Sequence, residues 1–215
     1  MPDPAIPSAE VFSLGPFQTN CYVIRAAGDD CWIVDAGPEP GPMIGHIRQL
    51  GLTPAAVVLT HSHADHIAGL SDIKEAFPDA PVLIHRAEAA FLADPTLNLS
   101  VVIGESVVAP AADRLVDGGE MLELGSARWR ILSTPGHSPG GITLWSEDAG
   151  LALVGDTLFA GSIGRFDFPT SDGPTLFRSI REVLYALPDE TRVLPGHGPA
   201  TTIGREKQSN PFVRP

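Results

Sequence analysis

Four residues of metal-ligand type lie within one short segment, Thr-His-Ser-His-Ala-Asp-His, which ends at His66. It follows the continuous apolar run Ala55–Leu59, which is typical of a strand buried on both faces. His61 and His63 point to the same side while the chain stays extended, because side chains along a strand alternate with a period of two. Asp65 and His66 turn toward a neighbouring position as the chain curls into a helix. A polar turn with incidental histidines is the alternative, but the density of ligands favours a metal site.

Three further residues of the same kind occur later, each in a turn directly after an apolar run. His137 and His197 lie in Pro-Gly-His segments, and Asp156 lies in Val-Gly-Asp-Thr. Rigid turns at strand ends can aim one side chain into a site, although each of these residues alone is more typical of an ordinary turn. Together with the first cluster they supply seven ligands. That number suits two metal ions with one bridging carboxylate.

Short strands with helices placed early and late must position these residues. The apolar runs predict strands over 21–24, 31–34, 55–59, 82–84, 114–116, 121–124, 128–132, 142–145, 151–154 and 192–194. Helical patterns run over 42–50, 66–77, 86–92 and about 175–187. Two mixed sheets covered by helices on their outer faces are the simplest packing for this order.

Length and composition restrict the class of protein. The chain has 215 residues without an evident linker, which predicts a single domain over residues 1–215. Its formal charge of −12 gives no indication of a nucleic-acid-binding face. No apolar run approaches the ~20 residues that a membrane span requires. The N-terminal segment MPDPAIPSAE lacks the basic and apolar regions of a secretory signal, so we expect a cytoplasmic protein without membrane or nucleic-acid partners.

The order of these motifs resembles that of the metallo-β-lactamase superfamily. The hallmark is the His-x-His-x-Asp-His segment followed by a histidine, an aspartate and a further histidine, and the similarity runs from about Leu14 to the C-terminus. The resemblance implies an α/β fold, a four-layer αββα sandwich with the metals at one edge between two mixed sheets. The implied ligands are His61, His63 and His137 for the first metal, Asp65, His66 and His197 for the second, and Asp156 as the bridge.

Finer features are most similar to the glyoxalase II-like hydrolases of the short single-domain kind. They are Thr-Asn-Cys-Tyr ending at Tyr22, Gly-Ser-Ile-Gly-Arg ending at Arg165, and the tail from Gly204 to Phe212. Full-length glyoxalase II carries an additional C-terminal helical domain that grips glutathione, and this chain reaches Pro215 without it. The resemblance therefore implies the chemistry more strongly than it implies S-lactoylglutathione as the substrate. True β-lactamases usually lack an aspartate bridge and are exported, so Asp156 disfavours that activity.

The expected reaction is hydrolysis of a thioester by two divalent metal ions, most simply zinc, although iron is possible. Metals lower the pKa of bound water to about 7, and one of them polarises the scissile carbonyl. A thiol leaves as thiolate with little need of a general acid, whereas an amine needs a proton donor that the sequence does not supply. Asp65 is in addition a candidate for orienting the attacking hydroxide. The alternative is an iron-dependent persulfide dioxygenase of the same superfamily, for which His61, His137 and Asp156 could form the face of two histidines and one carboxylate.

Several other residues have two interpretations. Arg165 could bind a substrate carboxylate or form a surface salt bridge, and Phe17 could line the substrate pocket or pack in the core. Asp35 could support the metal loop or merely stabilise a turn. Cys21 and Cys31 fit small core residues better than nucleophiles. The basic tail residues Arg205, Lys207 and Arg214 fit a solvated terminus better than a glutathione contact, and the sequence does not indicate an oligomeric state.

Overall fold

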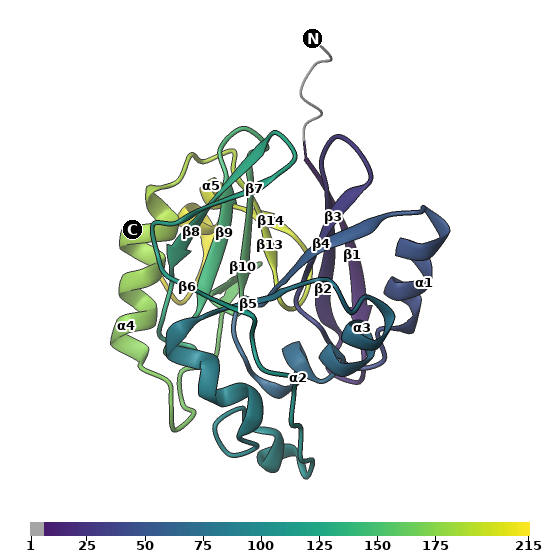
Figure 1. Ribbon diagram of the computed structural model, residues 1–215. Helices are drawn as coiled ribbons and strands as arrows, with labels where there is room; N and C mark the ends of the chain where they lie inside the picture. The colour runs from purple at the N-terminus through teal and green to yellow at the C-terminus, as the bar shows by residue number, and fades with distance from the viewer. Residues whose placement is uncertain (1–6) are drawn as a thin grey trace.

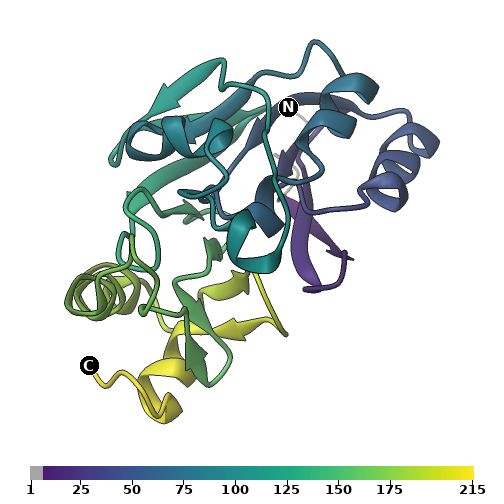
Figure 2. The ribbon, with the colours of Figure 1, turned by 90° about the horizontal axis from the view of Figure 1, so that it is seen from below.

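Two six-stranded β-sheets lie face to face in the computed structural model, which describes residues 7–215 (Figure 1). Residues 1–6, part of the segment predicted to carry no secretory signal, lie outside the described residues. The N-terminal half of the chain forms one sheet and the C-terminal half forms the other, so the colours of the ribbon separate into two sides in Figures 1 and 2.

The first sheet has the order β1-β2-β3-β4-β5-β6. Its strands are β1 (Ser8–Leu14), β2 (Thr19–Arg25), β3 (Asp30–Val34), β4 (Thr53–Val58), β5 (Val82–His85) and β6 (Arg114–Val116). Strands β1, β2 and β3 pair antiparallel with one another, and β3 to β6 pair parallel, so β3 belongs to both parts. This mixed pattern matches the sequence, because the hairpin joins β2 to β3 directly while helical segments connect the parallel strands.

The second sheet has the order β14-β13-β10-β9-β8-β7 and is also mixed. Its strands are β7 (Met121–Leu124), β8 (Ala127–Ser133), β9 (Ile142–Ser146), β10 (Leu151–Gly155), β13 (Arg192–Pro195) and β14 (Thr201–Thr202). Only β10 and β13 pair parallel. A separate two-stranded hairpin, β11 (Leu158–Phe159) and β12 (Ser162–Ile163), follows β10.

Helices cover the outer face of each sheet (Figure 1). The helices are α1 (Gly41–Gln49), α2 (Ala64–Ile67), α3 (Leu70–Ala76), α4 (Gly173–Arg178) and α5 (Ile203–Ser209). Residues of α1 and α3 pack on the first sheet, and residues of α4 and α5 pack on the second. The predicted αββα sandwich is confirmed.

Side chains along the central strands alternate between two cores. Cys21 and Val23 of β2 face the helices, whereas Tyr22 and Ile24 face the second sheet. Burial raises the pKa of the Cys21 thiol to about 12 and has the same effect on Cys31. Both cysteines are buried in the core, as predicted. A neutral buried thiol is also a poor nucleophile.

The helix predicted over 66–77 is in fact two helices. The first, α2, ends after Ile67, and α3 begins at Leu70. Gly69 between them donates its N–H to Ala36 O at 2.8 Å, and a Cβ there would overlap the carbonyl oxygen of Gly37. The prediction missed this break because the close approach of Gly69 to residues 36–37 is a tertiary contact.

Other boundaries also differ from the sequence prediction. The segment predicted as a helix over 86–92 is a 3₁₀ helix, Arg86–Ala93. The helix predicted over 175–187 begins at Gly173, where the Asp172 side chain caps it, and it changes to a π-helix over Ser179–Val183. Strand β1 and helix α5 were not predicted. In the described part of the chain, no helix is both long and apolar enough to cross a membrane.

Candidate metal centre and its pocket

All seven predicted ligands come from the segments that follow the C-terminal ends of four strands. The first cluster follows β4, His137 follows β8, Asp156 follows β10 and His197 follows β13. One of these strands belongs to the first sheet and three belong to the second, so the site lies where the two sheets meet at one edge.

The structure brings the seven side chains together as three groups whose ligand atoms lie within 4.8 Å of one another. The groups are His61, His63 and His137; His61, His66 and Asp156; and Asp65, His66 and His197. His63 Nδ1 and His137 Nε2 are 2.8 Å apart. The first and third groups coincide with the two ligand sets that the family resemblance implied.

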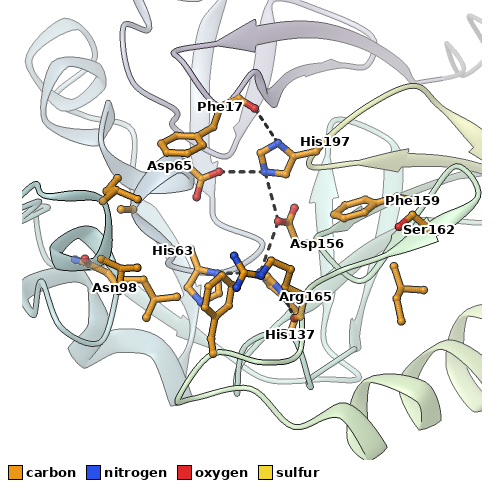
Figure 3. Close-up of a pocket in the computed structure, with 16 residues that line it drawn as sticks. Phe17, His63, Asp65, Asn98, His137, Asp156, Phe159, Ser162, Arg165 and His197 are labelled. Carbon is orange, nitrogen blue, oxygen red and sulfur yellow. Dashed lines mark hydrogen bonds and ion pairs between the residues drawn. The ribbon is translucent and has the colours of Figure 1, made fainter. Parts of the chain in front are cut away.

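Asp156 lies between these two sets (Figure 3). Its Oδ2 is 3.6 Å from His137 Nε2 and 3.4 Å from His197 Nε2, and its Oδ1 is 3.4 Å from His66 Nε2. One carboxylate therefore faces a histidine of the first set and two histidines of the second.

The buried polar atoms of the cluster show that these residues fit metal ions. Among the seven side chains of the cluster, four ligand-type atoms are buried and have no hydrogen-bond partner: His61 Nε2, His63 Nε2, His66 Nε2 and Asp156 Oδ1. Leaving such atoms unsatisfied costs about 1–3 kcal/mol each. Divalent cations would satisfy these atoms, so the donor set fits bound metal.

Two histidines of the first set, His61 and His63, are held neutral. Burial lowers the pKa of His63 to about 3, with a contribution from nearby His137. Burial also lowers the pKa of His61 well below its usual value, and His66 and His63 lower it further. Neutral imidazole is the form that coordinates metal ions.

The carboxylates of the site are ionised and attract positive charge. Burial alone would raise the pKa of Asp65 and Asp156, but the neighbouring histidines, His66 first among them, lower it below the usual range. Burial would lower the pKa of His66, but Asp65, Asp156 and Asp35 raise it well above the usual value. The negative charge of these carboxylates thus favours a cation between them, which is where a metal ion would bind.

Asp35 supports the first cluster from behind. Its carboxylate accepts hydrogen bonds from Thr60 N at 2.7 Å and from Thr60 Oγ1 at 2.8 Å. His66 Nδ1 lies 2.8 Å from Asp35 Oδ2, so its proton is directed at this carboxylate and Nε2 faces the cluster. Of the two interpretations that the sequence left open, the structure shows the supporting one.

Backbone carbonyls orient two more histidines in the same manner. His137 Nδ1 donates to Arg165 O at 2.7 Å, and His197 Nδ1 donates to Phe17 O at 3.2 Å. Because a carbonyl oxygen can only accept, Nδ1 of each ring carries a proton, and Nε2 of each ring faces the site.

Glu88 is a supporting residue that the sequence did not reveal. It is fully buried and accepts from Ser62 N and Ser62 Oγ, both at 2.6 Å, and from Gly140 N at 2.9 Å. It thus ties the turn between His61 and His63 to the turn that carries His137. A Cβ on Gly140 would lie 2.8 Å from Glu88 Cγ, which explains the glycine at this position.

A pocket of about 390 Å³ opens above the cluster (Figure 3). The predicted residues that line it are His63, Asp65, His137, Asp156, His197, Phe17 and Arg165. Phe17 is 47% exposed at the pocket rather than packed in the core. The sequence did not reveal the remaining apolar wall, which includes Leu99, Val102 and Phe168.

Arg165 lines the pocket and also forms a surface salt bridge. Its Nε and Nη2 donate to the two carboxylate oxygens of Asp167, both at 2.9 Å, and its guanidinium lies 4.2 Å from the centre of the Phe168 ring. The structure therefore shows the surface salt bridge that was one of the two interpretations of Arg165. The backbone carbonyl of Arg165 in addition orients His137.

The C-terminal tail packs against the molecule instead of extending into solvent. Glu206 of α5 is fully buried and accepts from Gly161 N at 2.9 Å, and Asn210 donates to Ser162 O at 3.0 Å. The tail thus holds the β11–β12 hairpin, which carries Phe159 into the pocket. The expectation that the basic tail residues are solvated is confirmed for Arg205 and Arg214, whose side chains are exposed, whereas Glu206 and Asn210 anchor the tail through partners 45 and 48 residues away in sequence.

A family model described as the metallo-beta-lactamase superfamily matches residues 14–197. The chain belongs to this superfamily. It is 43% identical to the probable metallo-hydrolase YqgX of Bacillus subtilis over 93% of this chain and 94% of that protein. It is 36% identical to the hydroxyacylglutathione hydrolase GloC of Haemophilus influenzae over 95% of this chain and 97% of that protein.

Solved structures agree with this membership. The BLEG-1 B3 metallo-beta-lactamase superimposes with a TM-score of 0.92 at 37% identity, over 96% of this chain and 99% of that one. The protein TTHA1623, solved in a di-iron-bound form, has a TM-score of 0.85 at 35% identity, over 95% and 100% of the two chains. The superfamily member described here is accordingly a metal-dependent hydrolase by class, and its site carries a divalent-metal ligand set.

Proposed function

We propose that this protein hydrolyses thioesters with two divalent metal ions, zinc by preference. The observation that carries the proposal is the group of seven converging ligands with Asp156 between the two sets. The similarity to GloC supports a thioester of glutathione as one candidate substrate. In this proposal His61, His63 and His137 hold one ion, Asp65, His66 and His197 hold the other, and Asp156 bridges them.

Two bound ions would supply a nucleophile at neutral pH and an electrophile for the scissile carbonyl. Asp65 is proposed to orient the attacking water. Its contacts with the described residues, from Thr19 Oγ1 at 2.8 Å and His197 Nε2 at 3.1 Å, are made through Oδ2. Oδ1 is then available to accept a proton from the water.

The pocket favours a leaving group that departs without protonation. Among the described residues that line it, the ionisable side chains are those of the metal cluster and Arg165. Arg165 is held by Asp167 and is a poor acid, since a guanidinium retains its proton. A thiolate needs no proton to leave, whereas an amine does, so a thioester suits this pocket better than an amide.

The alternative of a mononuclear iron dioxygenase has less support. It would use His61, His137 and Asp156, which do not form one of the three close groups found among the described residues. The close group of His61, His66 and Asp156 does offer two histidines and one carboxylate, but the seven side chains together also form the two outer groups, which suit two ions. The di-iron form of TTHA1623 shows that a relative can hold iron, so iron in this chain is compatible with a two-metal site.

The proposal is tested with one acyl group on three leaving groups. Metal-loaded protein is assayed against an N-acetylcysteamine thioester, the matching oxygen ester and the matching amide, with S-lactoylglutathione and a β-lactam beside them. We expect the thioester to be cleaved at least about tenfold faster than the amide, with about two metal ions per chain. Oxygen uptake with glutathione persulfide and one iron per chain would replace the proposal with the dioxygenase, and preferred cleavage of the β-lactam would also overturn it.

A further inference from the structure

The pocket above the metal cluster has an apolar wall built from four separate segments. Aromatic side chains come from Phe17, Phe159 and Phe168. Aliphatic side chains come from Leu99, Val102, Ile103 and Ile163. Several remain open to solvent at the mouth, since Val102 is 65% exposed and Ile103 is 41% exposed. Apolar side chains gathered at a pocket mouth indicate a surface that an apolar group covers.

The charges at the pocket indicate which group that is. Arg165 is the single Arg or Lys among the described residues that line the pocket. Its Nε and Nη2 atoms both donate to the carboxylate of Asp167. A substrate half with free carboxylates would therefore find no unpaired cation on the wall. Biological thiol carriers are polar, hydrogen-bonding molecules, so the apolar half of a thioester is its acyl group.

One segment of the wall, which carries Asn98 and Leu99, is hydrogen-bonded to the segment that carries His63 and Asp65. Asn98 is fully buried, and its side chain donates to Phe91 O at 3.1 Å and to Val107 O at 2.9 Å. Its backbone carbonyl accepts from Ala64 N at 2.8 Å, between His63 and Asp65. Leu99 follows in a left-handed conformation with φ of 66°, which a non-glycine residue adopts at a cost. This segment is therefore hydrogen-bonded to the residues that carry the ligand cluster, and its conformation is typical of a binding surface that exists before the substrate arrives.

We propose that this wall binds the acyl chain of the substrate, so that the enzyme prefers thioesters of medium-length apolar acids over those of short polar acids. The inference rests on the proposed thioester hydrolysis and names the substrate class for it. The volume of about 390 Å³ falls within the range of small-molecule pockets.

A chain-length series tests the inference. The substrates are acetyl, butanoyl, hexanoyl and octanoyl thioesters of N-acetylcysteamine, a neutral thiol. We expect kcat/KM to rise about twofold to fourfold for each added methylene that the wall covers. A profile that is flat or falls with chain length would overturn the inference.

A matched pair of variants locates the effect. Val102→Ser changes a side chain that lines the pocket, and Val101→Ser changes its neighbour, which is 49% exposed and does not line it. Both residues lie in the short 3₁₀ helix Ser100–Ile103 and are open to solvent, so both variants should fold. We expect Val102→Ser to lower kcat/KM several-fold more for the octanoyl thioester than for the acetyl thioester, and Val101→Ser to leave both values close to those of the wild type. Equal effects of the two variants would count against the wall.

Binding of the free acids separates this inference from the proposed function. Acetate and octanoate share a carboxylate and differ in the length of their hydrocarbon chain. A difference between their Kd values for the metal-loaded protein, measured by calorimetry, therefore reports the binding of that hydrocarbon chain. Tighter binding of octanoate, weakened by Val102→Ser, would support the wall even if no thioester were hydrolysed. Thioester hydrolysis with equal Kd values for the two acids would leave the function intact and reject the wall.

Discussion

At the scale of single residues, the cluster of ligand-type side chains could be predicted from sequence, while most of their supporting partners could not. His61, His63 and Asp65 lie within five positions of one another, so their proximity is local. Glu88 contacts Gly140 across 52 positions, and no spacing rule links a lone glutamate to a distant glycine. Asp35 was recognised only as one of two alternatives, because its contact with His66 depends on how β3 and β4 pair.

The contacts of Asp35 predict the effect of Asp35→Asn. An amide would place an N–H₂ group against one of the donors Thr60 N, Thr60 Oγ1 and His66 Nδ1. We expect the affinity for the metal to fall about 10-fold to 100-fold, because the His66 ring loses the partner that orients it. Competition with a zinc-binding dye measures this change. Asp30→Asn, on an exposed side chain at the start of β3, is the control, and equal affinities in both variants would refute the supporting role of Asp35.

At the scale of elements, most predicted strands were confirmed because their apolar runs are continuous and bounded by turns. The buried strand before the ligand cluster was predicted at 55–59 and is found as β4, Thr53–Val58. Elements defined by tertiary contact escaped prediction. The break between α2 and α3 depends on Gly69 approaching residues 36–37, and α5 depends on the buried Glu206.

The link between α5 and the β11–β12 hairpin predicts the effect of Glu206→Gln. The carboxylate accepts from Thr201 Oγ1 at 2.6 Å, from Gly161 N at 2.9 Å and from Asn210 Nδ2 at 2.9 Å. An amide cannot accept all three, so we expect the free energy of unfolding to fall by about 1–3 kcal/mol. Urea unfolding followed by tryptophan fluorescence measures the loss. Glu190→Gln, on an exposed side chain, should change stability little; an unfolding midpoint in Glu206→Gln equal to that of the control would contradict the anchoring role.

At the scale of the whole molecule, the αββα sandwich brings the ends of strands from both sheets to one edge. His61, His63, Asp65 and His66 follow a strand of the first sheet, whereas the other three ligands follow strands of the second. The metal centre therefore joins the two halves of the chain. The family resemblance and the order of elements in the sequence predicted the architecture. The apolar wall of the pocket was not predicted, because its four segments are far apart in sequence and come together only in the folded chain.

A site that joins the two sheets predicts that metal removal destabilises the entire fold. Metal at a thousandfold excess over its Kd stabilises the folded chain by about 4 kcal/mol. For a chain of this size the corresponding change in Tm is about 8–16 °C. We expect a chelator to lower Tm by this amount and added zinc to restore it, as measured by calorimetry. An unchanged Tm in protein shown by elemental analysis to be metal-free would contradict the joining role.

The bridging role proposed for Asp156 allows the most direct test of the proposal that two metal ions, held by the seven side chains, hydrolyse a thioester. Wild-type protein and Asp156→Asn are loaded with zinc under the same conditions, and metal content and turnover of the best thioester substrate are measured on the same samples. We predict about two ions per chain and thioester turnover in the wild type, with fewer ions and a loss of about a hundredfold or more in kcat/KM in the variant. A variant that keeps full turnover, or a wild type that binds two ions and cleaves no thioester, would contradict the account.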